Sequence, residues 1–172
     1  IKMRKFWIFL AIFAVFWASA ANATDERHWK FKKFENGRLV FKTNKRNFKC
    51  VLKDLKFISY TAKPECFDDP KKAKNLQEDY DKMIEQKLGK LQKYNVLVQG
   101  DGNEFRVCDL GETVAKNLIE SGLAVSDRTD FDKESKKARE KNAGIFNEKI
   151  LHITKCVLGE NDGNIKDALK NE

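Results

Sequence analysis

The stretch from Val107 to Phe146 constrains the fold more than any other, because it sets an ordered series of elements. A short alternating run ends at Leu110, where Gly111 turns the chain. An amphipathic segment follows and stops at Gly122, and glycine suits the left-handed residue that closes a helix because it has no Cβ. A polar link leads to a segment rich in Lys, Glu and Arg that stops at Gly144. The series predicts a strand, a helix and a second, more exposed helix.

The other strands are predicted from alternation of apolar and polar residues, which is the period of a half-buried strand. Asn36-Gly37 indicates a hairpin, since both residues accept a positive φ. With the run before Gly111, the pattern predicts strands at 29–32, 39–43, 48–52, 94–99 and 104–110. Three strands in meander at the start of the chain fit the opening of an OB-type barrel.

The longest helix is predicted from Pro70 to Leu91, where apolar residues recur at spacings of three and four. Asp68 or Asp69 can cap it, and proline suits the first turn because its missing N–H is not needed there. The connection from Lys53 to Asp69 is predicted to be a loop. The element order is therefore β-β-β-α-β-β-α-α, an α+β chain built mainly on a β barrel.

Residues 1–23 have the layout of a secretory signal peptide, with Arg4 and Lys5 before an apolar run of 12 residues and small residues near Ala23. A membrane-spanning helix needs about 20 residues, so cleavage is favoured over a stable membrane anchor. We expect a secreted or periplasmic protein. Without the three basic residues of this segment, 31 basic residues face 26 acidic ones, a net charge of +5. That excess suits nucleic acid, a membrane surface or a wall polymer, and equally a basic protein with no anionic partner.

The chain has four cysteines, and export would place them in an oxidising compartment where an even number indicates two disulfides. Four cysteines allow three pairings, and buried free thiols are the alternative. No CxxC motif occurs and two histidines stand alone, so the spacing does not favour a zinc site. The cysteines are Cys50, Cys66, Cys108 and Cys156.

The stretch from Val107 to Phe146 resembles the C-terminal half of the staphylococcal-nuclease-like (thermonuclease-like) domain family. The resemblance rests on the glycine before the first helix, the Gly122-Leu123-Ala124 stop, the charged helix with Ala138-Arg139, and Gly144-Ile145-Phe146. The last aromatic is usually tryptophan in that family. Including the element order, the resemblance covers roughly Lys30 to Phe146.

The resemblance implies a five-stranded OB barrel with three helices. It implies a domain at 24–146, with a C-terminal extension at 147–172 packed on it. It also makes the strands of Cys50 and Cys108 neighbours, which favours the pairs Cys50–Cys108 and Cys66–Cys156.

Members of this family hydrolyse nucleic acid with two arginines that bind the phosphate, aspartates that ligate calcium and a glutamate that acts as general base. Guanidinium groups bind phosphate oxygens in pairs, calcium needs hard oxygen ligands, and the attacking water needs a positioned base. In this sequence the first arginine position holds Lys49, which keeps the charge but not the planar two-pronged donor. One calcium aspartate matches Asp54, and the general-base position holds Phe57. The other calcium aspartate matches Arg38, and the second arginine falls near Gly102 or Asn103.

We therefore expect a degenerate site with no catalytic residue and no cofactor. It would bind single-stranded nucleic acid or another polyanion without hydrolysis, with Phe57 and Tyr60 as neighbouring aromatics for stacking. Asp54 alone is too weak for a metal site and is expected to make a turn or cap hydrogen bond. The candidate binding residues are Arg46, Lys49, Lys53, Lys56 and Arg106.

Three alternatives stay open. The chain is an active calcium-dependent nuclease if Glu65, Asp68 and Asp69 fold back to supply the missing carboxylates. It is an extracytoplasmic protein-interaction domain if its partner is a protein. Without any such role, the lysines are a solvated face and the aromatics are core or loop packing.

Overall fold

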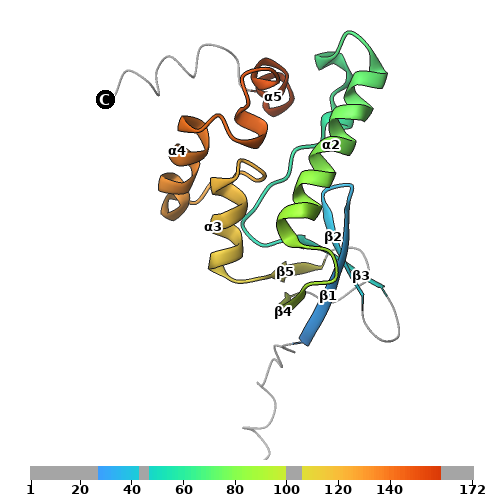
Figure 1. The fold of residues 1–172 in the computed structure, drawn as a ribbon, viewed down its shortest axis with the longest axis vertical. Helices are drawn as coiled ribbons and strands as arrows, with labels where there is room; N and C mark the ends of the chain where they lie inside the picture. The colour runs from blue at the N-terminus through green and yellow to red at the C-terminus, as the bar shows by residue number, and fades with distance from the viewer. Residues whose placement is uncertain (1–26, 43–46, 100–105, 160–172) are drawn as a thin grey trace, which may run out of the picture.

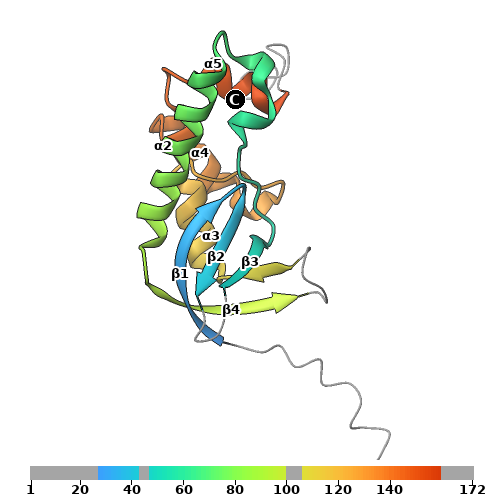
Figure 2. The same cartoon turned by 90° about the vertical axis from the view of Figure 1, so that its right-hand side faces the viewer.

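The computed structural model of the protein describes residues 27–42, 47–99 and 106–159. Five strands close into a barrel in the order β1-β2-β3-β5-β4, and the helices gather at one end of it (Figure 1, Figure 2). Along the chain the elements follow the order β-β-β-α-β-β-α-α, with a further helix after them. The predicted α+β class, the five-stranded barrel and the element order are confirmed.

The first three strands form an antiparallel meander of β1 (Arg27–Glu35), β2 (Arg38–Lys42) and β3 (Asn47–Leu52). The hairpin between β1 and β2 turns at Asn36-Gly37, whose φ angles are 51° and 74°. The pairing of β1 with β2 shifts by one residue at Lys32, and the side chains on both sides of this bulge, Phe31 and Phe34, are buried. The bulge breaks the period-2 alternation, which explains why the predicted strand stopped at Lys32 and missed residues 33–35 of β1.

The barrel closes through β4 (Lys93–Gln99) and β5 (Val107–Asp109). β4 pairs antiparallel with β1 and β5, while β5 pairs in parallel with β3. The parallel seam is the shortest, with two registered pairs, Val51 opposite Val107 and Leu52 opposite Cys108. Residues 100–105, which include the start of the strand predicted at 104–110, lie outside the described residues.

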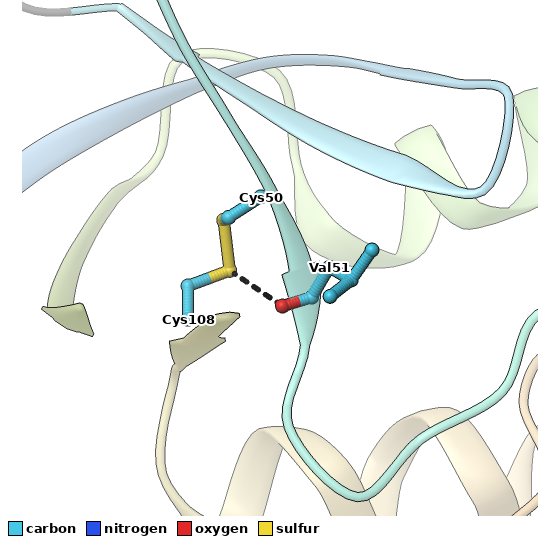
Figure 3. Close-up of a disulfide and its surroundings, with 3 residues drawn as sticks. All are labelled: Cys50, Val51 and Cys108. Atoms are coloured by element: carbon cyan, nitrogen blue, oxygen red, sulfur yellow. Dashed lines mark hydrogen bonds between the residues drawn. A yellow bond between two sulfur atoms is a disulfide. The ribbon is translucent and has the colours of Figure 1, made fainter. Parts of the chain in front are cut away.

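A buried disulfide between Cys50 and Cys108 fastens this short seam. Figure 3 shows it between β3 and β5, with the Cys108 sulfur 3.4 Å from the carbonyl oxygen of Val51. A disulfide sulfur carries no hydrogen, so this approach is a packing contact and not a hydrogen bond. The second disulfide joins Cys66 to Cys156. These are the pairs that the family resemblance favours.

Helix α2 (Pro70–Leu88) runs from the helical end of the molecule to the barrel (Figure 2). The Asp69 side chain caps it by accepting a hydrogen bond from the Lys71 N–H, at 2.9 Å. The helix ends at Leu88, three residues before the predicted end, and its C-cap is Gly89, whose φ is +73°. Its buried Tyr80 hydroxyl donates to the carbonyl of Leu123 at 2.7 Å and accepts from the N–H of Ile58 at 3.2 Å. This one side chain therefore holds together three segments far apart in the sequence.

The connection between β3 and α2 contains two 3₁₀ turns, η1 (Tyr60–Ala62) and η2 (Pro64–Cys66), within the predicted loop. The chain after residue 146 forms helix α5 (Leu151–Leu158), which packs on these turns. The Tyr60 hydroxyl and Thr154 Oγ1 lie 3.2 Å apart, and both residues are buried. With the disulfide from η2, this contact attaches α5 to the body.

The segment from residue 112 to 146 forms α3 (Glu112–Glu120), η3 (Thr129–Phe131), α4 (Asp132–Glu140) and η4 (Gly144–Phe146). Gly122 and Gly144 meet backbone to backbone, and the Ile145 N–H donates to the Gly122 carbonyl at 2.9 Å. A Cβ on Gly122 would lie 2.1 Å from the Ala143 carbonyl oxygen. Glycine is thus required here by a close backbone approach as well as by a φ of +63°.

The described ranges contain no helix with the length and apolar character that crossing a bilayer requires. The predicted signal peptide at 1–23 lies outside these ranges, as does the end of the chain after residue 159.

Candidate functional site

The predicted binding residues follow β3 and its continuation. Along β3 exposed and buried side chains alternate, so Lys49, Val51 and Lys53 face outward. At about 3.3 Å per residue, the Cα atoms of Lys49 and Lys53 lie roughly 13 Å apart. Lys56 follows on a segment that pairs with Val125 by two backbone hydrogen bonds of 2.8 and 3.0 Å. The structure thus arranges the lysines in a line rather than in a compact cluster.

Each lysine of this line has an acidic neighbour. Lys49 Nζ lies 3.6 Å from Glu35, Lys53 Nζ lies 3.9 Å from Asp109, and Lys56 is ion-paired with Asp127. All three lysines are exposed. Ion pairs of this kind contribute about 0–1 kcal/mol, because water screens them and two long side chains must be ordered. An incoming anion can therefore displace the acids at little cost.

Glu35 is the acid nearest to the position matched to the first phosphate arginine. Its carboxylate accepts a hydrogen bond from Lys33 and lies near Lys49, and these contacts hold its pKa below the ordinary range. Glu35 is therefore ionised at neutral pH, and it offsets one positive charge beside Lys49.

Arg106 precedes β5 and lies over an aromatic ring. Its guanidinium carbon is 4.9 Å from the centroid of Phe48, within the range of a cation–π contact. Its carbonyl accepts a hydrogen bond from the Val51 N–H at 2.9 Å. Phe48 is buried and alternates with the exposed Lys49, so the Arg106 guanidinium lies over the face of β3 opposite to that of the β3 lysines. Arg46, the remaining predicted residue, lies outside the described residues.

Asp54, matched to a calcium ligand, lies in a turn directly after β3 with a φ of +60°. Its carboxylate accepts a hydrogen bond from Arg128 at 2.7 Å, and its carbonyl accepts one from the Ser126 hydroxyl at 2.8 Å. A guanidinium at this distance repels a divalent cation. Arg128 also binds Asp130, and this lowers the pKa of the Asp130 carboxyl. Calcium does not fit these residues, and in the described residues no three His, Cys, Asp or Glu side chains are grouped to hold a metal ion.

The two aromatic residues expected to stack on bases are placed differently. Phe57, in the general-base position, is half-buried, and its ring centroid lies 4.7 Å from that of Phe34. Tyr60 is fully buried and packs edge-on against Tyr80. The expectation that Tyr60 offers a stacking surface is therefore wrong, because its ring belongs to the core between α2 and α5.

The carboxylates considered as replacements lie far from the barrel strands. Figure 1 and Figure 2 both place the η2 turn beside α5, at the helical end of the molecule. Glu65 lies 3.6 Å from Lys63, and Asp69 is engaged as the cap of α2. Asp68 lies between them. The loop does not fold back onto β3, so none of the three completes a site there.

Sequence reasoning missed the partners of the candidate residues. Asp127 lies 71 positions from Lys56, and Arg128 lies 74 positions from Asp54. No short-range spacing links residues so far apart. Only the contact between Glu35 and Lys49 had a signal in the sequence. The predicted three-strand meander places the end of β1 near β3, with β2 between them.

Comparison with models of known protein families finds no match to this chain, and comparison with curated proteins finds none. Inference about function therefore rests on the barrel and the side chains of its outer face.

Proposed function

We propose that this chain is a divergent, exported staphylococcal-nuclease-like domain that binds nucleic acid or another polyanion without hydrolysing it. The observation that carries the proposal is the side chain in the general-base position. Phe57 packs against Phe34 there, and a phenyl ring cannot accept a proton from water. Arg38 and Lys49 stand at two further catalytic positions of the family, where a calcium ligand and a bidentate phosphate donor would be needed.

Binding is supported by the weakness of the ion pairs along β3. Lys49 and Lys53 face acids at 3.6 and 3.9 Å in exposed positions. A polyanion that replaces these acids gains the release of its condensed counterions, which is the main source of sequence-independent affinity for nucleic acids.

Export is supported by the two disulfides, Cys50–Cys108 and Cys66–Cys156. Disulfides persist in oxidising compartments and are rare in the cytosol. Together with the predicted signal peptide, they favour a secreted or periplasmic protein.

The test is binding of a fluorescent single-stranded oligonucleotide to the protein and to Lys49→Glu/Lys53→Glu, measured by anisotropy between 50 and 200 mM salt. Each lost phosphate contact lowers the slope of log affinity against log salt by about 0.7. The double variant should therefore bind more weakly, with a slope smaller by about 1.4. Lys72→Glu/Lys149→Glu makes the same charge change at two exposed lysines away from β3. Equal losses in both double variants would contradict a site on β3.

Protein interaction is the second candidate, and Val51 is the observation that favours it. This side chain is 39% exposed between Lys49 and Lys53, so a partner protein that covers this face would bury its apolar surface. Oligonucleotide binding that is absent at every salt concentration would favour this candidate over the first.

A further inference from the structure

Three lysines form an unbroken row across three neighbouring strands of the barrel. Lys30 of β1 is directly opposite Lys42 of β2 on one side and Lys93 of β4 on the other. Directly opposite residues of antiparallel strands point to the same face, and all three side chains are exposed. Neighbouring strands lie about 4.8 Å apart, so the row spans roughly 10 Å. We call Lys93, Lys30 and Lys42 the lysine row.

The lysine row differs from the β3 lysines in making no ion pair with any residue that the structure describes. Within residues 27–42, 47–99 and 106–159, none of its three ammonium groups makes an ion pair, whereas Lys33, Lys49 and Lys53 each do. Like charges directly opposite one another on a sheet are destabilising. A local conflict that no ion pair within the described ranges offsets is typical of a functional surface.

The residues beside the row can form hydrogen bonds but are not acidic. The next outward pair on β1 and β4 is His28 and Asn95, and Lys42 is opposite Asn47 of β3. All of these side chains are exposed. The exposed large apolar residues of the described chain, Val51 and Leu91, are both aliphatic. The aromatic rings next to the row, Trp29 and Tyr94, are partly buried against the core.

We propose that the lysine row binds an acidic polysaccharide, a chain that carries a carboxylate or sulfate on successive sugars. The spacing of the strands is close to the length of one sugar in an extended polysaccharide, so each ammonium can meet the charge of one sugar. The phosphates of an extended nucleic acid strand lie farther apart. The flanking Asn47 and Asn95 amides can donate and accept hydrogen bonds with sugar hydroxyls. Lysine ammonium groups donate hydrogen bonds to anions that approach from many directions.

This inference does not depend on the proposed function. The two surfaces lie on the same barrel but use different side chains, since Asn47 at the end of the row is two residues before Lys49. Asn47 and Lys49 lie on the same outward face of β3, so a charge change on one surface is felt at the other. Row variants should therefore weaken oligonucleotide binding no more than a triple variant of lysines outside the barrel strands does. Lys49→Glu/Lys53→Glu should weaken polysaccharide binding no more than Lys72→Glu/Lys149→Glu does, so either proposal can fail alone.

The test compares Lys30→Gln/Lys42→Gln/Lys93→Gln with a control that removes the same charge, Lys72→Gln/Lys133→Gln/Lys149→Gln. The control lysines are exposed, lie outside the barrel strands and make no ion pair with any described residue. Titration calorimetry at low salt would use heparin and polygalacturonate oligosaccharides, which separate sulfate from carboxylate, with neutral dextran as the uncharged chain. We expect the row variant to bind one or both acidic chains at least about tenfold more weakly, from the loss of three exposed charge pairs. The control should bind like the original protein.

Thermal unfolding at low salt separates loss of the ligand site from loss of the fold. Relief of like-charge repulsion should leave the Tm of the row variant unchanged or higher while binding falls. Lys30→Glu provides a second readout, because an acid between two lysines should raise Tm and weaken binding together. Equal losses of affinity in the two triple variants would overturn the proposal, as would full polysaccharide binding by the row variant. Binding of an oligonucleotide but no polysaccharide through the row would also overturn it.

Discussion

The contact between Gly122 and Gly144 gives the sharpest prediction for the fold, because a single added carbon has no room there. Gly122 has a φ of +63°, and a Cβ at this position would lie 2.1 Å from the Ala143 oxygen and 2.7 Å from the Ala143 carbonyl carbon. Both of these are backbone atoms, so no side chain can move aside. Gly122→Ala must therefore push the turn after α3 away from η4.

The expected cost has two parts. The left-handed backbone costs an alanine about 1–2 kcal/mol. Separating the two turns breaks the hydrogen bond from the Ile145 N–H to the Gly122 carbonyl, which contributes about 0.5–1.5 kcal/mol, and loosens the packing of the fully buried Ile145. We expect Gly122→Ala to cost about 3 kcal/mol, which lowers Tm by roughly 6–12 °C in a chain of this size.

Gly37→Ala is the matched control, since Gly37 has a φ of +74° but its Cβ would meet no atom within 4 Å. Gly37→Ala should lower the free energy of unfolding only by the cost of the left-handed backbone, about 1–2 kcal/mol. Chemical and thermal unfolding of both variants would give the difference. Equal destabilisation by Gly122→Ala and Gly37→Ala would refute the role assigned to the close approach.

Three further predictions concern the core and the disulfides. The Cys66–Cys156 disulfide is partly exposed, unlike the one inside the barrel, so graded reductant followed by alkylation and mass spectrometry should show it opening first. Replacing both of these cysteines by serine should cost about 2–5 kcal/mol in urea unfolding. Tyr80→Phe leaves two buried backbone groups, the Ile58 N–H and the Leu123 carbonyl, without their hydrogen-bond partner. It should lower the free energy of unfolding by about 1–3 kcal/mol, with an unchanged fold by circular dichroism. Burial raises the pKa of the Asp81 carboxyl in the folded protein, so folding favours the protonated carboxyl. The stability that this adds is full below the ordinary pKa of an aspartate and is lost as the pH rises through the folded pKa. Asp81→Asn should therefore raise Tm at pH 7 and have little effect at pH 3; a lower Tm at pH 7 would contradict this sign.

The sequence was informative where local pattern and fold agree. Asn36-Gly37 predicted the first hairpin, and Gly122 and Gly144 marked the ends of two elements whose backbones turn out to touch. Alternation predicted a strand at 48–52, and β3 spans Asn47–Leu52. In each case a short stretch carries the whole physical reason, so no knowledge of distant residues was needed.

The sequence was less informative where distant residues decide. Tyr60 looks like an aromatic beside a binding site, but α5 covers it through Thr154, 94 positions away. The bulge at Lys32 hid the end of β1, residues 33–35, because it breaks the alternation that pattern reading depends on. The acids beside Lys49, Lys53 and Lys56, and the unpaired state of the lysine row, depend on strand register. Charge counts cannot distinguish a paired lysine from an unpaired one.

The central claim is that this barrel binds a polyanion and does not cut it. The most direct measurement follows binding and cleavage together, with labelled single-stranded DNA and RNA incubated with the purified protein in calcium or in chelator. We predict salt-sensitive binding that is the same in both conditions, with the nucleic acid intact. Cutting that requires calcium, and that disappears with chelator, would contradict the claim.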